Sequence, residues 1–504
     1  MNEQKPLLFV GGDLSGIQKF LYNITSKKAA VSLKGRSAYL VNYTKELCED
    51  ILSLPSVATG NRKETVYCSG GKFYLITDDT QDIRSALDEF YHQAEKKLWE
   101  EHRGQLGIAI AYVPFYFTDN TESEVVINEE TGNIGNLWKN INNKFTTLKN
   151  QKFHSVLQDQ YDTMFEVLPV GGKVHVCAII GTESAECVKL DKDSDGDVQV
   201  CAITGIESAE CVKLDKDSDG DAIWVLSSVK EQVDLGKVLR EKEHFKTFEE
   251  YAKGSYLGIL RMDVDGMGER IQKSNAFANL EEYRCFSEKL KSFFEGANST
   301  LRSLQQKPEF RDYLNIIYAG GDDLFIVGKW SKVLDYADEI RKAFATHTTG
   351  EGLTISGGLV VVGAKFPIAK AAEMAGDAED EAKKYIYNGK PKNAICFLGE
   401  CVSWNQEFDE VKQLKDEFIL QITQNGLSKG FLHKLMTYAT MAQSGKQMNY
   451  IWHSVYYLTR LMERCTNNTA RDFVRKTRDK EMSKGIGHLR LMALAARWAE
   501  LELK

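Results

Sequence analysis

Apolar and polar positions form two similar sets of short strand-like runs and longer amphipathic segments along this chain. In the first set, residues 7–21 predict a strand, a glycine-lined turn and the start of a helix. A helix, a glycine-centred hairpin, a second helix and a further strand are predicted after it, at residues 34–52, 66–76, 83–101 and 107–114. This order of elements is typical of an α+β domain.

The second set repeats this order. It predicts a strand at residues 256–262 and then a helix, a hairpin, a helix, a strand, a helix and a last strand, at 286–304, 315–328, 333–346, 353–362, 368–387 and 392–397. The first part of this order is the β-α-β-β half of a ferredoxin-like palm. Two such sets indicate an internal duplication, so we expect an α+β fold with two ferredoxin-like palm domains.

The other segments have different patterns. Residues 119–133 are acidic and loop-like, and residues 139–152 are basic and rich in asparagine, which predicts a connector. Apolar positions recur at helical spacing over residues 403–504, as in a four-helix bundle. We therefore expect a first palm, a linker with a small cysteine-containing domain, a second palm and a helical bundle, at residues 1–135, 136–250, 251–402 and 403–504.

Composition narrows the class of protein. A chain of 504 residues has room for about three to five domains. It has no apolar run of about 18 residues and no secretory signal, so we expect a cytoplasmic protein without membrane spans, whose ten cysteines are reduced thiols or metal ligands. The net charge of −8 argues against a nonspecific nucleic-acid binder, but not against a subunit that meets RNA inside an assembly.

Carboxylates stand where two predicted strands of the second palm end. A Gly-Gly-Asp-Asp step, Gly320 to Asp323, forms the tip of the hairpin, and Asp263-Val264-Asp265-Gly266 follows the first strand. Each motif alone is explained by a turn or a helix cap. Together they provide hard oxygen ligands from neighbouring strands, which suit Mg²⁺ bound to nucleotide phosphates.

With these motifs in this order, the chain resembles the large polymerase-cyclase subunit of type III CRISPR effector complexes. The resemblance implies that a GGDD palm converts ATP into oligoadenylate when target RNA is bound. It implies CRISPR RNA, target RNA, backbone subunits and small helical subunits as partners, and Mg²⁺ or Mn²⁺ as the metal. The catalytic residues would be Asp263, Asp322 and Asp323, with Asp265 and the Val264 carbonyl completing the metal site.

The resemblance also implies residues that hold nucleotides. In the second palm these are Gly266, Gly268, Gly320, Gly321, Ser356, Lys383 and Lys392. In the first palm, Lys72 and Phe73 replace the two acids of the hairpin. This degenerate palm would hold a second nucleotide around Gly70 and Gly71.

Residues 177–198 and 201–222 form a near-perfect tandem repeat. Each copy contributes two cysteines, and four thiolates can bind tetrahedral Zn²⁺ through Cys177, Cys187, Cys201 and Cys211. The resembled family often has a zinc ribbon here, but Ile180 and Thr204 stand where its second knuckle cysteines would be. A duplicated hairpin with free thiols is the alternative. The Asp-x-Asp-x-Asp-Gly runs lack the closing acid of an EF-hand loop and are read as solvated turns.

Other functions stay open at this level. The chain could be a catalytically silent scaffold, a stand-alone diguanylate or adenylate cyclase, or a palm enzyme that joins AMP to a different small molecule. Many members of the resembled family begin with an HD nuclease domain. The predicted first palm starts at residue 7 and the chain has no His-Asp dipeptide, so we expect no DNase in this protein.

The zinc hypothesis predicts about one zinc ion per chain, because a tetrahedral Cys₄ site binds one ion. Replacing Cys201 with Ser should release the zinc, as measured by metal analysis of freshly purified protein, with little effect on nucleotide binding by the palms. Metal-free wild-type protein would favour the free-thiol alternative.

Overall fold

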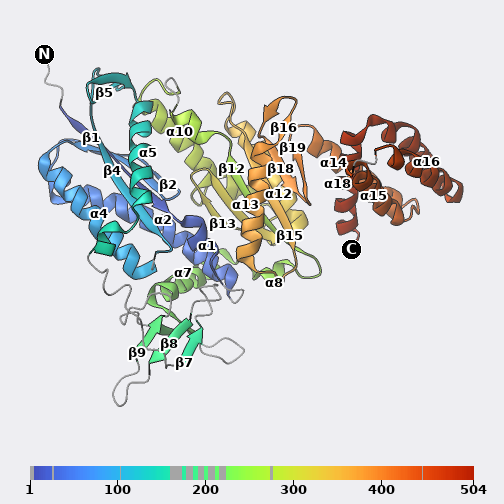
Figure 1. The fold of residues 1–504 in the computed structure, drawn as a ribbon, viewed down its shortest axis with the longest axis horizontal. Coiled ribbons are helices and arrows are strands. Elements are labelled where there is room, and N and C mark those ends of the chain that lie inside the picture. The colour runs from blue at the N-terminus through green and yellow to red at the C-terminus, as the bar shows by residue number, and fades with distance from the viewer. Residues whose placement is uncertain are drawn as a thin grey trace.

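The computed structural model describes residues 5–24, 28–102, 104–158, 173–176, 186–190, 198–201, 211–214, 223–272, 276–444 and 447–504. Figure 1 shows two sheets side by side, with the C-terminal helices beyond the second sheet. The α+β prediction with two palms and a helical C-terminal region is confirmed. Within the described residues, no helix is long and apolar enough to span a membrane.

The first palm is a six-stranded sheet of order β2-β3-β1-β4-β5-β6. Its strands are β1 (Leu7–Ser15), β2 (Lys63–Ser69), β3 (Lys72–Asp78), β4 (Gly107–Phe117), β5 (Glu124–Ile127) and β6 (Glu130–Asn133). Its helices are α1 (Ile17–Tyr22), α2 (Ala29–Ser53), α3 (Pro55–Ala58), α4 (Gln81–His102) and α5 (Gly135–Asn150). Side chains of β1 alternate between two cores: Phe9 packs against Trp138 of α5, while Val10 lies in the core that includes α2 and α4.

Two segments that we expected to form a connector belong to this palm. The acidic one contains β5 and β6, which extend the first sheet, because Asn128 and Glu129 both take positive φ and close a tight hairpin. The basic one lies in α5, whose apolar face packs on the sheet with Leu137, Trp138, Ile141 and Phe145. The many basic and asparagine residues of this segment made the apolar positions at helical spacing difficult to recognise in the sequence.

The second palm is a six-stranded sheet of order β13-β14-β12-β15-β18-β19. Its strands are β12 (Leu257–Val264), β13 (Leu314–Gly320), β14 (Asp323–Lys329), β15 (Ile355–Val362), β18 (Ala394–Phe397) and β19 (Glu400–Ser403), with a small hairpin of β16 (Ile386–Tyr387) and β17 (Lys390–Pro391). Its helices are α9 (Met267–Gln272), α10 (Leu280–Phe294), α11 (Thr300–Gln305), α12 (Trp330–His347) and α13 (Ile368–Lys384). The single helix predicted at 286–304 is divided into α10 and α11, with Gly296 at positive φ between them.

Glycines in this second sheet allow helices to approach both faces. A Cβ on Gly258 of β12 would lie 2.6 Å from Trp330 Cα of α12, and a Cβ on Gly358 of β15 would lie 2.4 Å from the Ala375 oxygen of α13. α12 and α13 therefore pack on opposite faces. The face with α13 carries Asp263, because it also carries Ile259, four residues earlier on the same strand.

The register of the two sheets corrects one prediction. Both hairpins have the same irregularity, between Thr65 and Tyr67 and between Ile316 and Tyr318. Ser69 pairs with Lys72 in the first palm just as Gly320 pairs with Asp323 in the second. Gly71 and Lys72 therefore occupy the places of the two acids, and the assignment to Lys72 and Phe73 was wrong by one residue. The sequence alone did not show which pair of residues closes each turn, because both hairpins have two consecutive glycines near the tip.

The linker region contributes α7 (Ser227–Glu243) and α8 (Phe248–Tyr251) and the strands β7 (Lys173–Val176), β8 (Glu186–Leu190), β9 (Val198–Cys201), β10 (Cys211–Leu214) and β11 (Ile223–Leu226). Backbone pairing of β8 with β9 places Cys187 opposite Cys201. The side chains of these strands and Cys177 lie outside the described residues, so zinc binding stays a prediction. In the second palm, Cys396 and Cys401 form a disulfide between paired strands, so the expectation of reduced thiols was wrong for this pair.

The C-terminal region consists of α14 (Glu407–Thr423), α15 (Gly430–Gln443), α16 (Gln447–Arg464), α17 (Asn468–Lys476), a π-helical turn (Thr477–Glu481), a 3₁₀ turn (Met482–Lys484) and α18 (Ile486–Glu502). Four of these helices match the predicted bundle segments. The additional helix α17 has few buried residues, such as Val474, so its apolar pattern in the sequence is weak.

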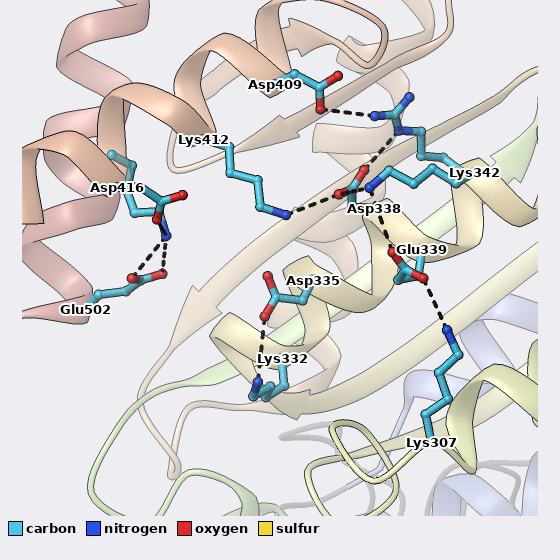
Figure 2. A network of polar contacts seen from close by, with 12 residues as sticks. Lys307, Lys332, Asp335, Asp338, Glu339, Lys342, Asp409, Lys412, Asp416 and Glu502 are labelled. Carbon is cyan, nitrogen blue, oxygen red and sulfur yellow. Dashed lines mark hydrogen bonds and ion pairs between the residues drawn. The ribbon is translucent and has the colours of Figure 1, made fainter.

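An ion-pair network fastens these helices to the second palm (Figure 2). Its centre is Asp338 of α12, which is only 2% exposed. The Asp338 carboxylate accepts from Arg341 at 3.0 Å, from Lys342 at 2.8 Å and from Lys412 of α14 at 3.3 Å. Burial by itself raises the pKa of Asp338, but the hydrogen bond and charge of Lys342, with the other cations, lower it overall.

Replacing Asp338 with Asn should therefore destabilise the protein by about 3 kcal/mol at pH 7, because it leaves three cations around an uncharged group. A carboxyl whose pKa is lower when folded contributes stability above its unfolded pKa and loses it as the pH falls through the folded value. The loss in melting temperature should thus be largest at neutral pH and shrink toward pH 3. Glu339→Gln on the same helix is the control, since Glu339 is 37% exposed and its pair with Lys307 should contribute under about 1 kcal/mol.

Candidate metal and nucleotide site

Three carboxylates meet at one end of the second palm. Asp263 lies near the end of β12, Asp322 in the hairpin turn and Asp323 at the start of β14. Antiparallel pairing places Asp263 directly opposite Asp323. One oxygen of each residue lies within 4.8 Å of the other two. Among the described residues, this is the only such group of three or more His, Cys, Asp or Glu side chains.

Repulsion within this group is strong. Burial, followed by the charges of Asp322 and Asp323, raises the pKa of Asp263 to about 8. Burial and then Asp322 raise the pKa of Asp323 to about 6. Lys383 of α13 partly offsets the charge, with its ammonium 2.6 Å from Asp263 and 2.7 Å from Glu379. The excess of hard oxygen ligands over cations suits a divalent ion such as Mg²⁺ or Mn²⁺.

Two predicted site residues are bonded to each other instead of joining this group. One carboxylate oxygen of Asp265 accepts from Thr354 at 2.7 Å, from Ser356 at 3.0 Å and from the Asn393 amide at 3.1 Å. Ser356 is fully buried. Asp265 and Ser356 therefore fasten the end of β12 to β15 and to the turn before β18. Ser356 lies opposite Asp263 in the β12–β15 pairing, and Asp265 is not one of the three clustered acids.

The remaining predicted residues of this palm line the approach to the acids. Gly266 takes a φ of +73°, and a Cβ there would lie 3.7 Å from the Lys392 ammonium. A Cβ on Gly268 would meet nothing within 4 Å, so open space adjoins the start of α9. The buried Val264 donates its amide to the Asp322 carbonyl at 3.3 Å, which ties the strand end to the hairpin tip.

The first palm has a matching pair that the sequence motifs did not reveal. Asp13 of β1 lies opposite Lys72, as Asp263 lies opposite Asp323. The Asp13 carboxylate is 2.6 Å from the Lys149 ammonium and 3.9 Å from that of Lys72. One acid with two cations needs no metal. The Gly-Gly-Asp step at residues 11–13 could have indicated that Asp13 is the counterpart of Asp263. Nothing near Lys149 in the sequence indicated that α5 returns to this strand.

A small cavity of about 120 Å³ lies where the two palms meet. Asp322 and Gly321 line it from the second palm, and Ser69 and Lys72 line it from the first. Aromatic rings form much of its remaining wall: Tyr67, Tyr74, Trp138, Tyr283 and Phe286. The rings of Trp138 and Tyr283, one from each palm, have centroids 4.2 Å apart. A planar apolar group and a charged group could therefore bind side by side in this place.

Comparison with known proteins finds similar domains in both palms. The model of Csm1 subunit domain B matches residues 6–167, and that of the Cas10/Cmr2 second palm domain matches residues 256–396. The chain is 26% identical to a CRISPR system single-strand-specific deoxyribonuclease Cas10/Csm1 (subtype III-A) of Enterococcus italicus over 86% of this chain and 60% of the relative. It is 25% identical to the protein of that name from Mycobacterium tuberculosis over 93% of this chain and 63% of the relative. The chain thus spans about three fifths of these relatives.

Solved structures show the same fold at lower identity. The Csm1 chain of a Csm1–Csm4 subcomplex in the type III-A CRISPR-Csm interference complex has a TM-score of 0.62 at 19% identity, covering 99% of this chain and 70% of that one. A Csm1–Csm4 cassette in complex with cA4 has a TM-score of 0.58 at 20% identity, covering 97% of this chain and 70% of that one. A further cassette is in complex with one ATP, with a TM-score of 0.57 at 20% identity over 98% of this chain and 70% of that one.

The raised pKa values predict that the acid group destabilises the metal-free fold as the pH rises. Carboxyls whose pKa is higher when folded favour folding at low pH, and this contribution is lost between the unfolded pKa near 4 and the folded values of about 6 and 8. Asp322→Asn removes one repelling charge, so it should raise the melting temperature in EDTA at pH 8 and change it little at pH 4.5. Asp380→Asn, at an exposed position of α13, is the control. An equal gain at both pH values would contradict the repulsion argument.

Proposed function

Because the chain belongs to the Cas10/Csm1 family, we propose that it is a nucleotidyltransferase that converts ATP into an oligoadenylate-type messenger and releases pyrophosphate. The observation that carries this proposal is the acid group beside the cavity between the palms. Asp322 belongs to the acid group and also lines this cavity. A nucleotide bound at this junction, with only part of it in the cavity, would thus have its phosphates close to the carboxylates.

The reaction joins two nucleotides. The 3′-hydroxyl of one attacks the α-phosphorus of the other, a new oxygen–phosphorus bond forms, the bond to pyrophosphate breaks and the hydroxyl proton is released. A divalent ion held by Asp263, Asp322 and Asp323 would supply Lewis-acid stabilisation of the phosphates. Lys383 lies beside Asp263 and Lys392 lies near Gly266, and both would bind triphosphate oxygens as point charges.

The first palm would hold the second nucleotide. Lys72 lines the same cavity as Asp322 and is half exposed, so its ammonium is accessible to a phosphate. Gly70 and Gly71, both at positive φ, leave the backbone of the first hairpin open to close approach. Asp13 would orient Lys72 and Lys149 without binding a metal of its own. Formation of a 3′–5′ bond needs two nucleotides side by side, which gives the duplicated palm a function.

The partners are proposed on the same basis. The similar solved chains are Csm1 bound to Csm4, so we propose that this chain assembles with a Csm4-like subunit in a complex that carries CRISPR RNA and binds target RNA. The matched relatives carry the name of a single-strand-specific deoxyribonuclease. We propose no such site in the described part of this chain, where the palm acids form the one group suited to a metal.

Replacing both Asp322 and Asp323 with Ala should abolish nucleotide synthesis while RNA binding and assembly persist, because these acids serve the metal and not the core. The purified assembly would be incubated with ATP, Mg²⁺ and target RNA, and the products identified by mass spectrometry. Asp377→Ala on the exposed face of α13 is the control. Retained nucleotide synthesis in the double mutant would contradict the assignment of Asp322 and Asp323 as catalytic metal ligands.

The same experiment separates the alternatives. Product that appears only with target RNA supports the proposal, and product without target supports a stand-alone cyclase. No product with any nucleoside triphosphate supports a silent scaffold. AMP joined to a different acceptor would identify the other palm activity.

A further inference from the structure

The tips of the two hairpins touch each other. A Cβ on Gly70 of the first hairpin would lie 3.1 Å from both the Cα and the amide nitrogen of Gly321 in the second. Both glycines have positive φ, +59° and +66°. A side chain at Gly70 would therefore crowd the second hairpin, and the backbone of the degenerate palm lies directly against the residue before Asp322.

Two oxygens receive the Gly321 amide at this contact. Gly321 donates to Ser69 Oγ at 2.9 Å and to Glu295 Oε1 at 3.2 Å. The Ser69 hydroxyl in turn donates to the same Glu295 oxygen. Ser69 ends β2 of the first palm, whereas Glu295 directly follows α10 of the second. The three residues therefore form a closed triangle of hydrogen bonds across the junction.

Helix stability does not explain Glu295. It is the C-cap residue of α10, and a carboxylate at a helix C-terminus faces the negative end of the helix dipole. An acid here is locally unfavourable, while a lysine or asparagine would suit the position. The benefit of the carboxylate must come from the groups it binds, which are Ser69 and the Gly321 amide.

The hairpin tip has little other support. Glu295 and Ala319 line a cavity of about 920 Å³, and Gly321 and Asp322 line the cavity of about 120 Å³ between the palms. Contact with Gly70 supports the turn on one side, but Gly321 and Asp322 also border open space, so hydrogen bonds contribute to its position. Besides the triangle, the Asp322 carbonyl accepts the Val264 amide at 3.3 Å.

We propose that Glu295 and Ser69 are positioning residues, which hold the Gly321 peptide so that the Asp322 carboxylate stays in the acid group. The expected effect on catalysis rests on the proposed nucleotidyltransferase function. The expected effect on the position and mobility of the hairpin tip does not. Because Ser69 belongs to the other palm, the docking of the two palms sets the geometry of the acids.

The test uses Glu295→Ala and Ser69→Ala in the complete assembly, with Glu295→Gln as the conservative variant. Glu288→Ala is the matched control, since Glu288 is an exposed acid on the same helix. Hydrogen exchange of the peptide that covers residues 318–325 reports on the tip without any substrate. Turnover of ATP, Mn²⁺ binding and exchange of α18, as a distant reference, are measured in parallel.

We expect Glu295→Ala to speed exchange at the tip by about tenfold, as for the loss of one charge-assisted hydrogen bond, with α18 unchanged. The kcat for ATP should fall about 10- to 100-fold and the KM should change little, because a displaced acid impairs the reaction more than substrate binding. Glu295→Gln should recover most of the activity, since its amide oxygen still accepts from Gly321. Ser69→Ala should have a smaller effect of the same kind.

Wild-type exchange at the tip in both alanine variants would overturn the proposal, and so would faster exchange with unchanged kcat. If the wild-type assembly makes no product, the proposed function fails by itself. The positioning role is then decided by exchange and by Mn²⁺ affinity, which should weaken about tenfold in Glu295→Ala. Should Glu295→Ala fail to fold, Ser69→Ala decides by the same measurements.

Discussion

Mutual repulsion of three carboxylates is the constraint on which the rest of the structure depends. Two unit charges 4.8 Å apart repel by about 3 kcal/mol at an effective dielectric constant of 20, and the group contains three such pairs. A flexible chain would separate these charges. The pairing of β12 with β14, the turn at Gly321 and the ion pair with Lys383 hold them together. The stability of the fold offsets this electrostatic repulsion. Because a bound cation would relieve the repulsion, the acid group has an affinity for cations.

The two palms show what the same scaffold does with different charges. In the first, the acid on the central strand faces two lysines, so the site is neutralised from within. In the second, the two equivalent hairpin positions are acids, and Lys383, which partly offsets them, is shared with Glu379. The first palm has Gly71 and Lys72 where the second has Asp322 and Asp323. This exchange leaves the first site neutralised by its own lysines, whereas the second site suits a divalent ion and phosphates.

Support for this site comes from parts of the chain far from it in sequence. The palms are joined by rings from α5 and α10 and by direct contact of the hairpin tips. The α12 helix, on the opposite face of the second sheet from Lys383, is fastened to the C-terminal helices through Asp338. The three acids stay partly exposed, so a ligand can reach them.

The sequence by itself determined the kinds of elements and their order, because apolar periodicity and glycine turns are local properties. The duplicated palms, the strand ends with Asp263 and Asp322 and the helical C-terminus could all be predicted in this way. Only the tertiary structure decided which neighbouring acids converge. Asp263 and Asp265 are two residues apart, yet Asp265 bonds to Thr354 and Ser356 instead of joining the group. The turn of the first hairpin lies at Gly70 and Gly71, which shifts its equivalence with the second hairpin by one residue, and the return of α5 and α10 brought Lys149 and Glu295 to strands distant in sequence. Such contacts depend on register and packing between segments, which no local pattern encodes.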